Sequence, residues 1–371
     1  MRTAFFFGAG ASAAIEGIPS QAGLLREYFS KTYHDRRSPV ESNVRSLFRD
    51  TFGIDVYCKT DEPKELPTFE EVLGLIDLAK DCDANIGTQG PRTAATAPLV
   101  EQLAKTNCIS PMRLYFILLL AKAIHPNAVV YPAVFDGDTA YHKLLKYLNE
   151  RGELSDTVFM TTNYDIFFDA ALYKMDCAPR YGPRFSYDAP ATQLLVDAPT
   201  RLKESLGQKT EIDFFKLHGS VNWLHCNECG QTRYWLFRPL VLELLKVKSK
   251  GPFCSSCRTL GAPVIVPPTV FKSPDLAPAP LQGIWQEAEK KLTAVDRIVF
   301  VGYSFPDADM HVKQMLKRVQ VNRAMNQEYL VLTKTQKCEE KSRYKRFLGD
   351  RVDYRVGEFG KFVKNPSEWL D

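Results

Sequence analysis

Short apolar runs recur along the chain, and each of them ends in a small polar or glycine-containing cluster. Runs of this length and β-branched or aromatic composition are typical of buried strands, and the segments after several of them have helical periodicity. This alternation predicts an α/β fold with a parallel sheet. The runs and the clusters that follow them are 3–7 before Gly8-Ala9-Gly10-Ala11-Ser12, 157–162 before Asn163-Tyr164-Asp165, 214–217 before His218-Gly219-Ser220, and 298–301 before Gly302-Tyr303-Ser304. A further run at 329–332 predicts another strand.

The carboxyl ends of parallel strands meet at one edge of a sheet, and ligands of open α/β folds sit beyond that edge. We therefore expect the four clusters to converge on one crevice that holds a nucleotide. The first cluster follows its strand as a Gly-X-Gly turn, which lets a phosphate approach the backbone and the N-terminus of a helix. Position 13 is Ala where the common dinucleotide motif has a third glycine. Glycines that only tighten the strand–helix joint are the alternative.

Helical patterns dominate the region between the first two runs. Thr68 and Glu71 have the spacing of a capping box, and residues 112–124 form a strongly apolar helix that we expect to be buried. We interpret 30–150 as a helical insertion in a Rossmann-like core formed by 1–29 and 151–371. A plain helical layer on the sheet is the alternative. Residues 178–200 read as a Pro-bearing loop, and Asp307 is placed to cap the helix after the fourth run.

Composition narrows the class of protein. The chain has 371 residues, 45% of them hydrophobic and 25% charged, which is the ordinary globular mix. The net charge of +4 is too small to indicate direct nucleic-acid binding. The sequence predicts neither a signal peptide nor a membrane span, so we expect a cytoplasmic protein without a membrane partner. Nine cysteines in such a chain favour a reducing compartment, with clustered cysteines on a metal.

Four of the cysteines form two Cys-X2-Cys pairs. Cys226 and Cys229 make the first pair, and Cys254 and Cys257 make the second, with 230–253 between them. Two such pairs supply the four thiolates of a tetrahedral zinc site. Because protein fills all four positions, we expect a structural ion within a small zinc-ribbon module at 221–262. A redox role for one pair is the alternative.

Two polar residues at strand ends have the chemistry of a catalytic site. His218 follows the third run, and an imidazole there can take a proton from a hydroxyl near neutral pH. Asn163 follows the second run and offers an amide to a water or a ribose hydroxyl. An Asx turn or a helix cap is the alternative for Asn163.

Taken in order, these motifs resemble the sirtuin family. The resemblance rests on Gly8 to Ser12, Gly17-Ile18-Pro19, Thr162 to Asp165, Lys216 to Ser220, the two cysteine pairs and Gly302-Tyr303-Ser304; it spans residue 1 to about 335, apart from 30–150. It implies a Rossmann-like domain that binds NAD, a small zinc module, and cleavage of the nicotinamide–ribose bond. It also implies His218 as the base, Asn163 orienting the ribose or the attacking water, and Asp165 on the nicotinamide side. The residues implied to bind NAD are Gly8, Ala9, Gly10, Ser12, Ile18, Pro19, Thr162, Gly302 and Ser304.

The departures from the family pattern suggest which reaction occurs. Deacylating sirtuins usually continue Gly-Ile-Pro with Asp-Phe-Arg, whereas Ser20-Gln21-Ala22 follows here, and they usually have Gln-Asn-Ile-Asp where this chain has Thr162 to Asp165. The sequence is more similar to divergent sirtuin-like proteins of bacterial defence. That resemblance implies an NAD glycohydrolase, which depletes NAD during phage infection and yields nicotinamide and ADP-ribose.

Two other functions stay open at this point, an NAD-dependent protein deacylase and a non-catalytic sensor of an ADP-ribose-type ligand. We expect a homo-oligomer that a partner keeps silent or triggers, such as a helicase-type ATPase or an argonaute-like protein.

Overall fold

The computed structural model covers the whole chain. It describes residues 1–15, 23–30, 38–56, 66–81, 97–107, 109–125, 138–187, 210–235, 239–246, 252–267, 279–323, 327–335 and 337–370. Ile18 and Pro19, and the Ser20 and Gln21 that distinguish the chain from deacylases, lie outside these ranges.

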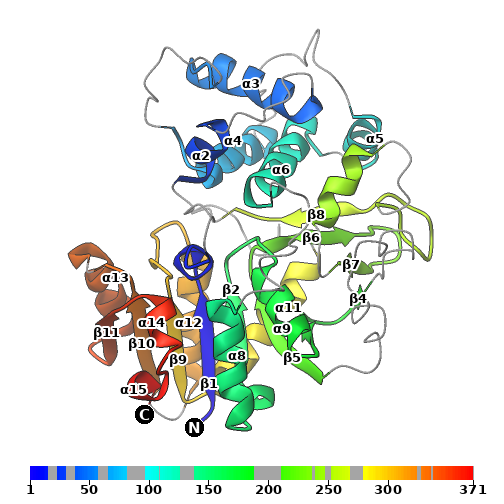
Figure 1. The fold of residues 1–371 in the computed structure, drawn as a ribbon. Coiled ribbons are helices and arrows are strands. Elements are labelled where there is room, and N and C mark those ends of the chain that lie inside the picture. Colours follow the sequence, from blue (N-terminus) through cyan, green and yellow to red (C-terminus); the bar gives the residue numbers. More distant parts are fainter. Residues whose placement is uncertain are drawn as a thin grey trace.

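A seven-stranded parallel sheet forms the core (Figure 1). Its strand order is β11-β10-β9-β1-β2-β5-β3, so β1 and β9 lie side by side at the centre and later strands extend outward from each, with β3 at the edge beyond β5 although it precedes β5 in the chain. This is the order of a Rossmann fold, extended by one edge strand, with its topological switch point between β1 and β9. The predicted α/β Rossmann-like sheet is thereby confirmed. The strands are β1 (Thr3–Phe7), β2 (Val158–Thr161), β3 (Cys177–Arg180), β5 (Thr210–Lys216), β9 (Arg297–Val301), β10 (Glu328–Thr333) and β11 (Val352–Val356).

Successive side chains of β1 point to opposite faces of the sheet and pack against the helices that cover each face. The Phe7 ring packs against residues of α8 (Ala140–Glu150), α9 (Phe167–Lys174) and α14 (Phe359–Phe362). Phe6 points to the other face and contacts Phe300, which packs on Tyr344 of α13 (Cys338–Leu348). Helices α11 (Ala279–Thr293) and α12 (Met310–Asn322) pack against each other behind the sheet in the view of Figure 1. Both faces are therefore covered, which explains the continuously apolar strands.

Five of the described helices between β1 and β2 form a separate group above the carboxyl ends of the strands (Figure 1). They are α2 (Leu24–Ser30), α3 (Pro39–Phe52), α4 (Phe69–Asp81), α5 (Pro98–Asn107) and α6 (Pro111–Ile124). The apolar α6 is the centre of the group and packs on each of the others. Thr68 and Glu71 form the predicted capping box, with each backbone N–H bonded to the other side chain. Helix α8 falls within the predicted insertion at 30–150, but it lies on the sheet, where Tyr141 contacts Phe7.

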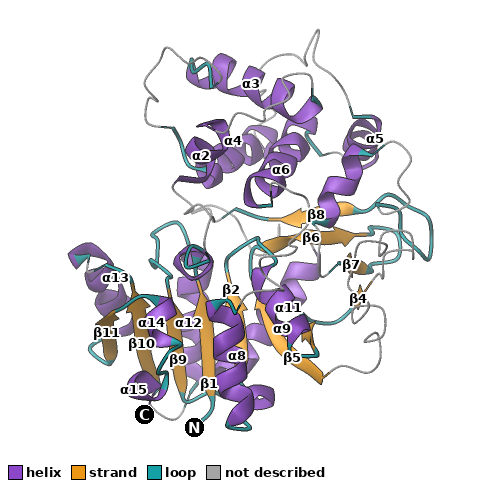
Figure 2. Cartoon of the chain, in the orientation of Figure 1, coloured by secondary structure: helices purple, strands orange, loops and turns teal. Residues whose placement is uncertain are grey.

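A second, smaller sheet lies beside the helical group, and it has the order β4-β7-β6-β8 (Figure 2). Its strands are β4 (Phe185–Tyr187), β6 (Gly219–His225), β7 (Thr232–Tyr234) and β8 (Ala262–Ile265), with the 3-10 helix η4 (Leu240–Leu245) packed on β6. The helical group is tied to this sheet by Arg113 of α6, which donates to the Ile265 carbonyl (2.7 Å) and pairs with Asp77 of α4 (2.6 Å).

Sequence reasoning did not predict the strands of the small sheet, β4, β6, β7 and β8, or two strands at the edges of the main sheet, β3 and β11. The edge strand β3 and the short β4 overlap the predicted loop at 178–200, and β11 closes the far edge of the main sheet. β3 contains Pro179, which an edge strand tolerates because one side of its backbone has no partner strand. The short elements η2 (Leu154–Asp156) and α15 (Ser367–Leu370) complete the description, together with α1 (Ala9–Ser12). Within the described part of the chain, no helix is long and apolar enough to cross a membrane.

Candidate functional site

The register of the main sheet brings the predicted strand-end clusters to one level. Phe7 of β1 pairs with Thr161 of β2 and with Val301 of β9, and Thr161 pairs in turn with Lys216 of β5. Asn163 and His218 each lie two residues beyond the paired positions of adjacent strands. Sequence reasoning placed both side chains at the same edge, and the sheet puts them in equivalent positions there.

Two glycine turns meet at the switch point. Gly8 donates to the Val301 carbonyl (3.0 Å) and Gly10 to the Gly302 carbonyl (2.9 Å). Gly302 has a φ of +59°, and a Cβ there would lie 2.4 Å from the backbone nitrogen of Ala11. A Cβ on Gly8 would likewise lie 2.5 Å from the Cα of Tyr303. These contacts require glycine at positions 8 and 302 whether or not a ligand is present. The predicted binding of a diphosphate by Gly8, Ala9 and Gly10 stays a prediction.

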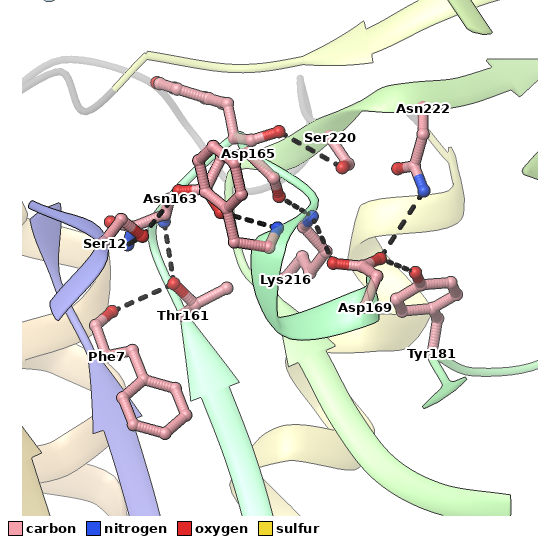
Figure 3. A network of polar contacts seen from close by, with 12 residues as sticks. Phe7, Ser12, Thr161, Asn163, Asp165, Asp169, Tyr181, Lys216, Ser220 and Asn222 are labelled. Atoms are coloured by element: carbon pink, nitrogen blue, oxygen red, sulfur yellow. Dashed lines mark hydrogen bonds and ion pairs between the residues drawn. The ribbon is translucent and has the colours of Figure 1, made fainter. Parts of the chain in front are cut away.

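Asn163 is held in one orientation by the ends of β1 and β2 (Figure 3). Its Nδ2 donates to the Gly8 carbonyl (2.9 Å) and to the Ser12 hydroxyl (3.0 Å). Its backbone N–H donates to the hydroxyl of Thr161 (2.9 Å), and that hydroxyl donates to the Phe7 carbonyl (3.0 Å). The residue is half-buried, its amide hydrogens are committed to the protein, and its side-chain oxygen lies on the opposite side of the amide group. This oxygen is an acceptor for a hydroxyl or a water.

Ser12 links Asn163 to the buried carboxylate of Asp165. The Ser12 hydroxyl donates to Asp165 Oδ2 (2.7 Å), so the Tyr141 hydroxyl at 3.0 Å donates to Ser12. Asp165 Oδ1 accepts from the Phe167 N–H (3.1 Å) and thereby fixes the start of α9. Burial raises the pKa of Asp165, and the nearby Lys216 and the Ser12 hydroxyl oppose that shift. Ser12 and Asp165 thus hold in place the loop that carries Asn163.

A second buried network continues from this loop toward the small sheet (Figure 3). Lys216 donates to the Asp165 carbonyl and pairs with Asp169 of α9 at 3.2 Å, and both charged side chains are completely buried. Asp169 Oδ1 accepts from the Tyr181 hydroxyl and from Asn222 Nδ2 (3.5 Å). Since Asn222 lies on β6, this network connects the Asn163 loop to the sheet that carries the cysteines.

His218 occupies the corner where β5 passes into β6. Gly219 has a φ of +86°, and a Cβ there would lie 1.9 Å from the Val264 carbonyl oxygen, so only glycine permits this corner against β8. The His218 carbonyl accepts from the Val266 N–H (2.9 Å). His218 is 7% exposed, and burial is the main cause that lowers the pKa of its imidazole. The imidazole is therefore neutral near pH 7, the form that can accept a proton.

Asp309 is the residue of this site that sequence reasoning missed. Its Oδ1 lies 3.7 Å from His218 Nε2, and its Oδ2 accepts from the Tyr303 hydroxyl (2.6 Å). The sequence predicts Asp307 as the cap of this helix, and that prediction is wrong, because α12 begins after Asp309 and Asp307 pairs with Lys313 (2.9 Å). The acidic repeat at 307–309 was a visible signal, but the sequence alone does not say which carboxylate turns inward.

The other predicted NAD contacts are spread along the same edge of the sheet. Thr162 is half-buried between β2 and Asn163, and its N–H approaches the Phe7 carbonyl (3.4 Å). Ser304 is exposed, and its carbonyl accepts from Arg343 of α13 (3.0 Å). Both positions are compatible with the edge at which a nucleotide would lie. Their contacts with NAD stay predictions.

The four cysteines come together as predicted. Their sulfurs all lie within 4.8 Å of one another, with Cys226 and Cys257 at 3.2 Å and Cys229 and Cys254 at 3.6 Å. Four thiolates at 2.3 Å from a tetrahedral zinc would be about 3.8 Å apart, so the cluster fits this ion with small adjustments.

The backbones of the two pairs also match. Gly230 (φ +70°) and Arg258 (φ +64°) each follow the second cysteine of a pair, and each donates to the carbonyl of the first cysteine (2.9 and 3.0 Å). The same turn is therefore built twice. Zinc would take all four sulfurs, which leaves no position for a substrate and gives the ion a structural role.

Comparison with solved structures gives Sir2 proteins. The chain is similar to a structure of Sir2 with a p53 peptide and NAD+ at 13% identity and a TM-score of 0.42, covering 99% of this chain and 92% of the other. A Sir2 structure bound to acetylated peptide gives 14% identity and a TM-score of 0.41 over the same shares. At these values the fold assignment rests on the strand order of the chain itself. No family model matches the sequence, and no curated protein matches it.

Proposed function

We propose that the chain is an NAD glycohydrolase that cleaves the nicotinamide–ribose bond and transfers the ribosyl group to water. One observation carries the proposal: a buried imidazole and an oriented amide occupy equivalent positions beyond adjacent strands of a Rossmann sheet. Two glycine turns lie at the neighbouring switch point, where folds of this order bind dinucleotides. The resemblance of the same motifs to sirtuins supports NAD as the dinucleotide.

The reaction matches the groups that are present. The bond from C1′ of the ribose to the nicotinamide nitrogen breaks, and its electron pair goes to the nitrogen, so that nicotinamide leaves neutral without a general acid. The ribose passes through an oxocarbenium-like state, as in other glycosyl transfers. Water then bonds to C1′, and His218 accepts its proton. The side-chain oxygen of Asn163 accepts a hydrogen bond from the attacking water or from a ribose hydroxyl.

Purified protein incubated with NAD tests the proposal, with nicotinamide and ADP-ribose followed by chromatography, alone and with the product of the neighbouring gene. We expect both products in equal amounts, and a loss of at least about 10²-fold in rate for Asn163→Ala and His218→Ala. Asn149→Ala, at an exposed position on α8, is the matched control and should keep full activity. If NAD binds but neither product forms under any of these conditions, the hydrolase proposal is wrong.

An acyl-lysine peptide added to the same reaction separates hydrolysis from deacylation. A hydrolase releases free ADP-ribose at a rate that the peptide does not raise. Formation of O-acyl-ADP-ribose would instead identify a deacylase. The defence role, the homo-oligomer and a helicase-type or argonaute-like partner remain predictions that belong to this proposal.

A further inference from the structure

A buried carboxylate at the start of α12 faces His218 and has one free oxygen. Asp309 is 4% exposed, and its Oδ1 is buried with no hydrogen-bond donor within the described part of the chain. The Nε2 atom of His218 lies 3.7 Å from this oxygen. A buried carboxylate oxygen without a donor is unfavourable, so such an atom in a folded protein points to a role.

The helix does not account for the orientation of Asp309. It occupies the N-cap position of α12, where an aspartate side chain commonly accepts from the first free N–H groups, but here it makes no cap hydrogen bond. The side chain instead turns toward the sheet, where the Tyr303 hydroxyl donates to its Oδ2 at 2.6 Å. Tyr303 follows the left-handed Gly302 directly, so the glycine turn at the switch point also fixes the tyrosine that holds Asp309.

We infer that Asp309 is the positioning residue of His218: its carboxylate accepts the Nε2–H of the imidazole and leaves Nδ1 as the base. This inference rests on the proposed function, because it gives His218 its tautomer for that reaction. The 3.7 Å separation is longer than a hydrogen bond, and catalytic hydrogen bonds are often long in unliganded proteins and shorten with substrate. Base, carboxylate and tyrosine then form a chain in which each member orients the next.

Burial is the largest cause that lowers the pKa of His218; Asp309 raises this pKa, and His311 on the same helix lowers it. Tyr164 lies on the other side with its ring centroid 6.3 Å from that of His218, and burial raises its pKa well above the usual value, so it stays neutral. Removing the carboxylate therefore lowers the pKa of His218 further, and the tautomer of the imidazole changes only if Asp309 accepts its Nε2–H.

The test combines NMR without NAD and kinetics with NAD. In protein labelled with 15N-histidine, Asp309→Asn should move the His218 titration to lower pH and abolish the pure Nε2–H tautomer. In the NAD assay, kcat should fall by about 10²-fold with little change in KM, and the acid limb of kcat/KM should move to lower pH. Tyr303→Phe keeps the Asp309 carboxylate but removes the hydroxyl that donates to its Oδ2. It should therefore give smaller changes in the His218 titration, the tautomer and kcat.

Asp307→Asn is the control, because it makes the same chemical change two residues away on an exposed side chain. It should leave the titration and tautomer of His218 unchanged. The inference is refuted if Asp309→Asn leaves both unchanged, or if Asp307→Asn alters them equally. If Asp309→Asn does not fold, Tyr303→Phe decides by the same readouts. Because the NMR arm needs no turnover, a wild type without NAD cleavage would refute the hydrolase proposal and still allow the pairing to be measured.

Discussion

The buried pair of Lys216 and Asp169 gives the sharpest prediction about stability. Both side chains are 0% exposed, and their nitrogen and oxygen are 3.2 Å apart. Asp169→Asn removes the negative charge but keeps an oxygen for Tyr181 and Asn222. The ammonium of Lys216 then loses its paired carboxylate in a site that solvent does not reach, and Asp165 is the acidic residue that still acts on it. Removing one partner of a buried ion pair costs about 3–5 kcal/mol.

An exposed pair of the same length provides the comparison. Lys334 and Glu358 also lie 3.2 Å apart, but their side chains are 77% and 49% exposed. Pairs of this kind contribute about 0–1 kcal/mol, because water screens the charges and the free side chains regain entropy. Glu358→Gln should therefore lower the free energy of unfolding by no more than about 1 kcal/mol. The two variants make the same chemical change at the same separation, so the difference between them measures burial.

Urea unfolding followed by circular dichroism supplies the measurement. Asp169→Asn should lose a large share of a stability that is typically about 5–15 kcal/mol. Adding Lys216→Met should restore much of the loss, since the uncompensated charge is then gone. If Asp169→Asn loses no more than Glu358→Gln, or if Lys216→Met makes the double variant still less stable than the single one, the reasoning from burial is wrong.

Three further results are expected. Gly302→Ala should lower the stability measured by thermal or urea unfolding more than Gly349→Ala does. Both glycines have positive φ, but only a Cβ at position 302 would meet backbone, 2.4 Å from the Ala11 nitrogen. Equal losses of stability would contradict the close packing of the two glycine turns. Wild-type protein should carry a zinc ion that elemental analysis detects, and Cys226→Ser should lose the metal and melt at lower temperature, whereas Cys338→Ser, outside the cluster, should change neither. Burial lowers the pKa of His125 to about 3, so the unfolded chain takes up a proton that the folded one refuses and stability falls as pH drops below about 6.5. Between pH 7 and pH 5, the free energy of unfolding measured by urea titration should fall by about 2 kcal/mol less in His125→Phe than in the wild type. An unchanged pH dependence would show that His125 is not neutral in the folded protein.

Local pattern was sufficient for most of the sheet. The runs at 3–7, 157–162, 214–217, 298–301 and 329–332 became β1, β2, β5, β9 and β10, because strands buried on both faces are apolar without interruption. The same pattern could not reveal β3 or β11, which lie at the edges. There, one side of the backbone has no partner strand, and residues such as Pro179 and Arg355 are tolerated.

The candidate site divides in the same way between local and distant causes. The sequence by itself determined that Asn163 and His218 follow strands whose carboxyl ends meet at one edge of the sheet, and that four cysteines can close a metal site, since both follow from short motifs and from the geometry of parallel strands. Only the tertiary structure decided that Gly8 and Gly302 press on one another, that the Asn163 amide is held by Ser12, and that Asp309 turns toward His218 while Asp307 remains outside. Those contacts join segments far apart along the chain, and whether they form depends on packing in three dimensions that no local spacing encodes.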